Sequence, residues 1–225
     1  MPEKPKRILA IEAAIRGGSI ALLDGGHEID SLRSTTDVSR AEDLLVNIAG
    51  MLERAQINKK TLDLIAVSNG PGSYTGIRIG LATALGLHNA LEIPCFGVSL
   101  LAAMAAAHEE NGAVVVAVPM GRDELCWQIF EKSSQNLREL DPAQVGNLNT
   151  FNDLIDRMAG VAVLLHNDLW SQFHGLSNSR AKNQKMVKYP SNLAYAIGRA
   201  AEDSRVASDL QPFYVRNPRY TPGFS

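Results

Sequence analysis

Residues 69–80 read Asn-Gly-Pro-Gly-Ser-Tyr-Thr-Gly-Ile-Arg-Ile-Gly and stand between a strand-like apolar run and a long apolar segment. The Gly70-Pro71-Gly72 sequence predicts a tight turn, and the hydroxyl of Ser73 or Thr75 can cap a helix that begins after it. A Walker phosphate loop is excluded, because Thr75 stands where that motif has its second glycine and no lysine follows. The stretch therefore predicts a turn that opens a helix, with amide groups that can receive an anion.

The helix predicted after this turn, residues 77–90, is apolar on nearly every side. Small residues form two rows along it, Gly76-Gly80-Ala84 and Ala82-Gly86-Ala90, with isoleucine and leucine in the gaps. Because each glycine costs a helix about 1 kcal/mol relative to alanine, such rows predict that another element approaches closely. The sheet of its own lobe can cover one side. A helix at 39–55, a partner protein, or both must cover the rest.

The segments around this helix predict the first half of an α/β protein. Ser39 and Glu42 form a capping-box pattern at the start of the 39–55 helix, and Ser99 caps a short Ala-rich helix that ends near His108. Tight turns make the first three predicted strands antiparallel neighbours. The strands are expected at 7–12, 19–23, 27–35, 62–67 and 95–98.

The second half repeats this order of elements without repeating its residues. Strands are expected at 113–118, 124–130, near Leu137 and at 161–165, and helices at 152–158 and 190–204. Both halves then read β-β-β-α-β-α, which is the order of the two ribonuclease-H-like lobes of actin and the sugar kinases. We therefore expect two lobes, 1–110 and 111–225, each with a mixed sheet.

The stretch 169–189 is polar and is expected to be a loop. It contains Arg180, Lys182, Lys185 and Lys188, and four cations in nine residues can contact a phosphate backbone. A solvated loop is favoured, because no aromatic side chain lies among these cations and the net charge of the chain is −2.

The overall composition is that of an ordinary globular protein. Of 225 residues, 45% are hydrophobic and 20% charged, and the net charge of −2 argues against non-specific nucleic-acid binding as the main activity. No apolar run is long enough for a membrane span or a signal-peptide core. Cys95 and Cys126 stand in apolar, strand-like runs, so we expect two reduced core residues and a cytoplasmic protein.

The sequence offers little for nucleotide hydrolysis. Actin-like ATPases hold phosphates in a turn after the first strand of each lobe, where an Asp and flexible glycines are useful. Here the first strand ends in Glu12-Ala13-Ala14, and the second lobe offers Pro119, which has no amide hydrogen to donate. We do not expect the chain to hydrolyse nucleotide by itself. If an anion or nucleotide binds, the expected contacts are Glu12, Gly70, Gly72, Ser73 and Arg78.

Metal and nucleophilic catalysis have no clear candidates either. None of the five histidines has a second histidine four residues away, so no metal site is expected. Ser73 lacks the Gly-x-Ser-x-Gly pattern of a nucleophile elbow. No residue is therefore predicted to be catalytic.

Nearly the whole chain resembles the TsaB (YeaZ) family of the glycoprotease-like, actin-like superfamily. The Gly-Pro-Gly-Ser-Tyr-Thr-Gly-Ile-Arg segment at 70–78 is the most specific match. The first two strands, Ile93-Pro94, 97–100, 122–124 and the tail Gln-Pro-Phe-Tyr-Val-Arg at 211–216 fit it as well.

The resemblance implies a bacterial, cytoplasmic, non-catalytic subunit. Such a subunit binds a catalytic relative, TsaD, alongside an ATPase, TsaE, and meets tRNA only through that complex, which attaches threonylcarbamoyl to the adenosine beside the anticodon of certain tRNAs. TsaD carries a His-x-x-x-His metal site that this chain lacks. The resemblance implies no cofactor bound by this chain alone and allows an adenine nucleotide at the shared interface.

In this family the first two helices of the N-terminal lobe form the dimer interface, and they match 39–55 and 75–90 here. A homodimer of the isolated protein is implied through the same surface. The interface residues expected on this basis are Leu44, Leu45, Ile48, Met51, Leu52, Thr75, Gly76, Ile79, Gly80, Thr83, Ala84 and Leu87.

Two departures from the family pattern bear on function. The family has Asp-Thr-[Ser/Ala] where this chain has Glu12-Ala13-Ala14, and His-Ser where it has Arg40-Ala41. Roles of those polar groups, including a shared nucleotide site, do not carry over to these positions. The residues leave three alternatives open: an actin-like-fold ATPase or kinase, a glycoprotease-like peptidase, and a direct tRNA binder through 180–188.

Overall fold

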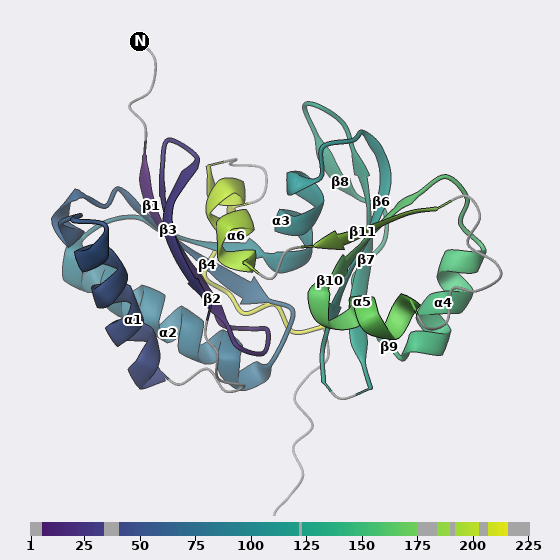
Figure 1. The fold of residues 1–225 in the computed structure, drawn as a ribbon, viewed down its shortest axis with the longest axis horizontal. Coiled ribbons are helices and arrows are strands. Elements are labelled where there is room, and N and C mark those ends of the chain that lie inside the picture. The colour runs from purple at the N-terminus through teal and green to yellow at the C-terminus, as the bar shows by residue number, and fades with distance from the viewer. Residues whose placement is uncertain are drawn as a thin grey trace, which may run out of the picture.

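The computed structural model describes residues 6–33, 41–121, 123–174, 184–189, 192–202 and 207–215. These residues form two β-sheets that stand side by side, with helices outside each sheet and between the two (Figure 1). The predicted cap Ser39, and Arg40, Arg122, Arg180 and Lys182, lie outside the described residues. Each sheet with its helices is one lobe of an α/β protein, as the sequence predicts.

The first sheet is mixed and has the strand order β12-β5-β4-β1-β2-β3. Its first three strands are antiparallel neighbours, and β4 runs parallel to both β1 and β5. The loop 13–18 joins β1 to β2, and a tight turn at Gly25-Gly26 joins β2 to β3. The apolar residues of β1 and β4 are buried, which is typical of central strands covered on both faces. The strands are β1 (Arg7–Glu12), β2 (Ser19–Asp24), β3 (His27–Arg33), β4 (Leu64–Gly70), β5 (Cys95–Ser99) and β12 (Ala207–Ser208).

Helices cover both faces of this sheet. On the outer face lie α1 (Ala41–Arg54) and α2 (Tyr74–Leu91), and on the face turned to the second lobe lie α3 (Leu100–Ala107) and α6 (Leu193–Ala201) (Figure 1). A single 3-10 turn, Lys59–Thr61, leads from α1 toward β4. Among the described residues, no helix is both long and apolar enough to cross a membrane.

The second sheet has the order β11-β10-β6-β7-β8, and β9 also pairs with β7. Its strands are β6 (Gly112–Pro119), β7 (Leu125–Lys132), β8 (Leu137–Glu139), β9 (Gln144–Gly146), β10 (Ala162–His166) and β11 (Lys185–Tyr189). Its outer face is covered by α4 (Leu148–Asp156) and α5 (Asn167–His174), whose buried Phe151 and Phe173 pack edge to face at 5.5 Å.

The hydrophobic core is continuous through the middle of the molecule. One cluster of buried side chains joins Ile8 of β1, Met104 of α3 and Val116 of β6, so the layer between the two sheets belongs to both lobes. Two further clusters lie under the outer helices, one in each lobe. The molecule therefore has five layers: helices, sheet, helices, sheet and helices.

The expected division into 1–110 and 111–225 needs one correction. The order of elements places the helix predicted at 190–204 in the second lobe, but α6 packs on β1 and β2, and β12 pairs with β5. A Cβ added to Gly198 of α6 would lie 2.5 Å from the side chain of Leu23, so the helix lies close to the first sheet. Sequence order cannot show which sheet an apolar helix face will cover.

The expectation of a loop at 169–189 is also wrong in its described part. Leu169 and Phe173 are four residues apart and both buried, which places them on one face of α5. Residues 185–189 form β11, which pairs in parallel with β10 and exposes Lys185 and Lys188 at the edge of the sheet. Exposed lysines on an edge strand discourage pairing with other chains.

Candidate functional site

A cleft of about 870 Å³ opens between the lobes. The first lobe contributes the loop after β1 and the start of α2, and the second contributes the turn after β6 and residues of α5. The residues that line it are Ala13, Ala14, Ile15, Arg16, Gly72, Ser73, Tyr74, Thr75, Gly76, Pro119, Met120, Gly121, Asp168 and Gln172.

Glycines let α2 begin close against the loop after β1. Gly72 has φ of +156°, and a Cβ there would collide with the carbonyl group of Ala14. The amide of Ser73 donates to the carbonyl oxygen of Ala14 at 2.7 Å. Gly76 packs against the carbonyl of Ala13 so closely that a Cβ has no room. The turn predicted at 70–72 is therefore also a docking point for the first loop.

The cap of α2 is Ser73, one of the two residues that the sequence proposes. Its Oγ accepts from the amide of Gly76 at 3.3 Å, and Thr75 is exposed. The first turn of α2 lines the cleft, so its amide groups lie at the wall where an anion would be held.

Glu12 ends β1 and is directed toward its own loop. Its side chain is 2% exposed, and Oε1 accepts from the amides of Ala14 at 2.6 Å and Ile15 at 2.8 Å. Burial raises the pKa of Glu12 to about 7, although the two backbone hydrogen bonds and the charge of Arg33 act in the opposite direction. The carboxyl group thus stabilises the loop. It does not line the cleft.

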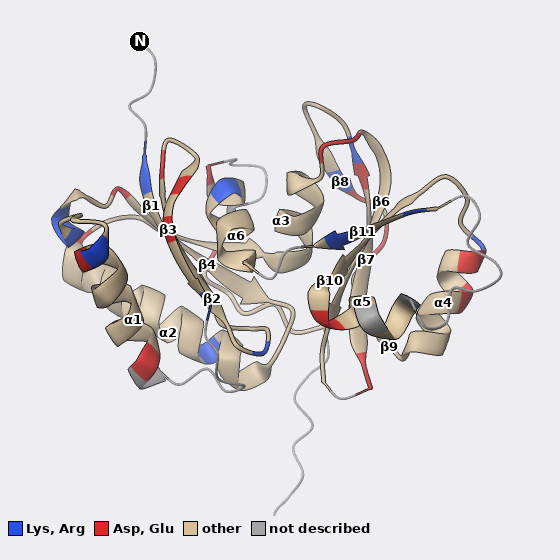
Figure 2. Cartoon of the chain, in the orientation of Figure 1, with Lys and Arg blue, Asp and Glu red and all other residues tan. Residues whose placement is uncertain are grey.

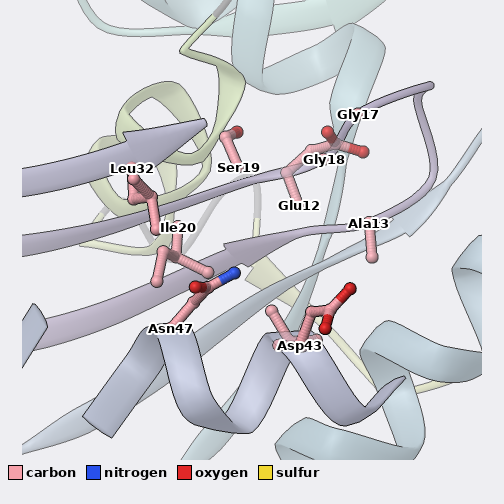
Figure 3. A pocket seen from close by; sticks show the side chains of 10 residues that line it. Glu12, Ala13, Gly17, Gly18, Ser19, Ile20, Leu32, Asp43 and Asn47 are labelled. Carbon is pink, nitrogen blue, oxygen red and sulfur yellow. The ribbon is translucent and has the colours of Figure 1, made fainter. Parts of the chain in front are cut away.

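A second, much smaller pocket lies between this loop and α1 (Figure 3). Asp43 and Asn47 project into it from α1, while the carboxyl group of Glu12 points toward Gly17 and Gly18 on the other side. The space of about 30 Å³ holds one or two water molecules. Among the described residues, no group of three or more His, Cys, Asp or Glu side chains is placed to hold a metal ion.

Charged groups from both lobes meet at the mouth of the cleft. Arg33 of β3 lies 3.9 Å from Asp168 of α5. The amide of Asp168 donates to Nδ1 of His166, which is 1% exposed, and burial lowers the pKa of His166. His166 is therefore a neutral hydrogen-bond acceptor that helps to place Asp168 opposite Arg33.

Two of the residues expected near an anion lie elsewhere. Arg78 stacks on the ring of Tyr74 at 4.1 Å, and a hydrogen bond to Tyr214 raises the pKa of its guanidinium group. Gly70 is buried beneath the carbonyl group of Phe213. Of the five expected contacts, Gly72 and Ser73 line the cleft. Tyr214, which contacts Arg78, and Phe213, which covers Gly70, both belong to the segment 207–215, and no local sequence signal connects that segment to the turn.

The outer faces of α1 and α2 form a surface with few charges, and their charged residues gather near the helix ends (Figure 2). Of the expected interface residues, Leu45 is 50% exposed and Thr75 is exposed. Five others are half-buried and five are buried inside the lobe. The half-buried residues are Leu44, Leu52, Ile79, Thr83 and Leu87, and the buried ones are Ile48, Met51, Gly76, Gly80 and Ala84.

The exposed apolar residues of this surface include two that the sequence did not single out. Val46 is 70% exposed and Leu85 is 39% exposed. Each helix already has a complete stripe of apolar residues that faces the core. An apolar residue outside that stripe is the sequence signal that could have identified Val46 and Leu85 as exposed. Gly80 faces inward, since a Cβ there would lie 3.3 Å from that of Ala13. The row Gly76-Gly80-Ala84 thus packs on its own lobe, and the exposed Leu85 lies on another side of α2.

The chain has relatives among known proteins. The sequence model of a family described as TsaD: tRNA N6-adenosine threonylcarbamoyltransferase matches residues 36–206. The tRNA threonylcarbamoyladenosine biosynthesis protein TsaB of Escherichia coli K12 is 31% identical over 134 residues, 58% of either chain. TsaB of Buchnera aphidicola subsp. Schizaphis graminum is 30% identical over 188 residues, 81% of this chain and 88% of its own.

A solved structure supports the same grouping at the level of the fold. A Pseudomonas aeruginosa protein described as similar to the peptidase YEAZ superposes with a TM-score of 0.68 at 22% identity, covering 94% of this chain and 100% of its own. The two lobes are thus ribonuclease-H-like and arranged as in the actin-like fold. The chain belongs to the family that the sequence model describes and, within it, to the TsaB (YeaZ) proteins.

Proposed function

We propose that this chain is a non-catalytic subunit in the biosynthesis of tRNA threonylcarbamoyladenosine and binds a TsaD-like catalytic subunit through the outer faces of α1 and α2. Its relatives carry the name of that pathway. The observation that carries the proposal is the exposure of Leu45 and Val46 on α1 and of Leu85 on α2, the two helices that cover the outer face of the first sheet. Large apolar side chains exposed together mark an interaction surface.

The cleft supports a non-catalytic role. The carboxyl group of Glu12 is engaged by its own loop, and Pro119 offers no amide hydrogen at the matching turn of the second lobe. An anion in the cleft would find its main hydrogen-bond donors in the backbone amides at the start of α2. We therefore propose that the free chain binds no nucleotide, and that an adenine nucleotide is held only where the partner adds further groups.

The remaining partners follow from the same proposal. A TsaE-like ATPase acts on the complex, and tRNA meets this chain indirectly through it. In the absence of the catalytic subunit, the exposed face of α1 and α2 pairs two copies of the chain. This homodimer and the heterodimer compete for the same apolar surface.

The test is binding of the purified chain to the TsaD-like protein of the same genome, measured by calorimetry and co-purification. Val46→Asp places a charge on a side chain that is 70% exposed, so it should abolish binding while the fold is retained. Leu140→Asp is the matched control, because Leu140 is 39% exposed on the second lobe. A Val46→Asp variant that binds as wild type does would refute the interface, and a wild-type chain that does not bind would refute the function.

The same samples test whether the chain is an enzyme. Under the proposal, the free chain shows no magnesium-dependent ATP turnover and no peptidase activity. Turnover that disappears in Glu12→Ala would instead identify an ATPase of the same fold.

A further inference from the structure

Residues 207–215 run across the ends of β5 and β4 to the start of α2 (yellow in Figure 1). We propose that this segment, here called the strap, is a positioning element that fixes the turn at 70–73 and the first turns of α2. Three separate contacts carry the proposal. Its last step, an effect on partner binding, rests on the proposed function.

The first contact ties the strap to β5. Ser208 pairs with Gly97 in the antiparallel β12–β5 ladder, and its Oγ donates to the carbonyl oxygen of Gly97 at 3.2 Å. The same Oγ accepts from Nδ2 of Asn69 at 3.2 Å. A Cβ on Gly97 would lie 2.5 Å from the carbonyl oxygen of Asp209, so glycine is needed where the strap crosses this strand.

The second contact places the strap on the turn itself. The amide of Phe213 donates to the carbonyl oxygen of Asn69 at 2.7 Å. Gly70 has φ of +122°, and a Cβ there would lie 2.6 Å from the carbonyl oxygen of Phe213. The family-specific glycine at position 70 therefore has a second role beside its backbone conformation, since it leaves room for the strap.

The third contact joins the strap to α2. The rings of Tyr214 and Tyr74 lie 5.0 Å apart, and Arg78 lies 4.1 Å from the centre of the Tyr74 ring. The guanidinium group of Arg78 also forms a hydrogen bond to Tyr214. Leu210 and Tyr214 pack against the core cluster beneath α1 and α2. The ring pair and the cation–ring contact thus hold the first two turns of the helix.

These contacts restrain one part of the molecule and leave another alone. They reach β5, β4 and the start of α2, which lines the cleft and continues into the proposed partner surface. None of the three contacts involves a strand of the second sheet, while Val215 at the end of the strap packs against the middle layer that both sheets share. Loss of the strap should therefore loosen residues 70–80 before it affects the second lobe.

The experiment is hydrogen exchange of the full chain, followed by mass spectrometry at labelling times too short for the whole molecule to unfold. Tyr214→Ala should speed exchange of the amides at 74–78 about tenfold, because it removes the Tyr74–Tyr214 ring pair and the hydrogen bond of Arg78 to Tyr214, while the contact of Arg78 with the Tyr74 ring remains. Tyr214→Phe keeps the ring pair and should change the exchange rate at 74–78 less than Tyr214→Ala does. Phe213→Pro removes the N–H group that donates to Asn69, whereas Phe213→Ala keeps that N–H group. The amides at 70–76 should therefore exchange faster in Phe213→Pro than in Phe213→Ala.

Two results would overturn the strap: unchanged exchange at 70–80, or an equal increase in peptides from 112–132, which would show a general loss of stability. Binding to the TsaD-like subunit is measured separately and should weaken in Tyr214→Ala. Faster exchange with unchanged affinity would refute the link to the partner surface. A wild-type chain that does not bind would refute the proposed function, and the exchange results would still decide the strap.

Discussion

Glu12 shows how one side chain can stabilise a loop and still limit stability as the pH rises. Its carboxyl group accepts two backbone hydrogen bonds inside the lobe, where the side chain is 2% exposed to solvent. Burial outweighs those bonds, and the pKa of Glu12 rises from 4.5 to about 7. The carboxyl group therefore changes its charge in the neutral range, far from where an exposed glutamate does.

This shift predicts a pH-dependent free energy of unfolding. Because the pKa is higher in the folded chain than in the unfolded one, the contribution of Glu12 is fully present below pH 4.5 and is lost as the pH rises through about 7. Over that range wild type should lose up to about 3 kcal/mol relative to Glu12→Gln, whose side-chain oxygen still accepts from the loop amides. Urea unfolding at a series of pH values measures the difference.

The control for this prediction is Glu53→Gln, because Glu53 is exposed on α1. It should leave the pH dependence as in wild type. Parallel stability curves for wild type and Glu12→Gln would mean that Glu12 does not titrate in the neutral range.

At the scale of single residues, the sequence predicted roles with a local cause and missed those with a distant one. The cap at Ser73 was predicted because the serine and the amide it serves are three residues apart. Glu12 was expected to face a ligand, yet the Ala14 and Ile15 amides occupy it, which depends on how the loop closes. The contact of Arg78 with Tyr214 joins residues that are far apart in the sequence, and no spacing rule connects them.

At the scale of elements, α2 shows that the two rows of small residues have different purposes. The row that includes Gly76 and Gly80 packs on the loop after β1 and on β4. The row that includes Gly86 is on the open side, where a Cβ on Gly86 would meet nothing within 4 Å. Sequence alone identified both rows but could not tell which one faces inward.

The same substitution should therefore have opposite effects at two positions of one helix. Gly76→Ala places a Cβ against the carbonyl of Ala13 and should lower the free energy of unfolding by about 2 kcal/mol. Gly86→Ala adds a methyl group to an exposed helix position and should raise it by about 1 kcal/mol. Chemical unfolding of both variants at one pH measures the two changes. If both variants were stabilised, Gly76 would not be in contact with the first loop.

Prediction of the elements failed where burial depends on a distant sheet. The strands β1, β2 and β4 and the helix α2 follow from local apolar patterns and turn residues, and the structure confirms them. The helix α5 was missed, although Leu169 and Phe173 have helical spacing, because the stretch around them is polar. The position of α6 was wrong because its apolar face fits any sheet, and only the folded chain shows which sheet it covers.

At the scale of the whole molecule, the shared middle layer should make the two lobes unfold together. Leu23→Ala removes a fully buried side chain of the first sheet, and we expect a loss of about 3 kcal/mol. Both tryptophans, Trp127 and Trp170, lie in the second lobe. If unfolding is cooperative, the fluorescence midpoint and the far-ultraviolet circular dichroism midpoint should shift equally.

Ile155→Ala is the matching change, because Ile155 is a residue of α4 in the second lobe and is 2% exposed. It should also move both midpoints together. A Leu23→Ala variant whose circular dichroism midpoint falls while its fluorescence midpoint stays in place would show that the lobes unfold separately.

The return of α6 and β12 to the first sheet also sets an order of completion during synthesis. All strands of the second sheet come from one continuous stretch, 112–189, while the first sheet needs 7–99 and then 193–208. A chain that leaves the ribosome from its N-terminus has every strand of the second sheet before the first receives its last helix and edge strand. The lobe that is made first is thus the one that is finished last, and the part of its inner face under α6 is covered only late in translation.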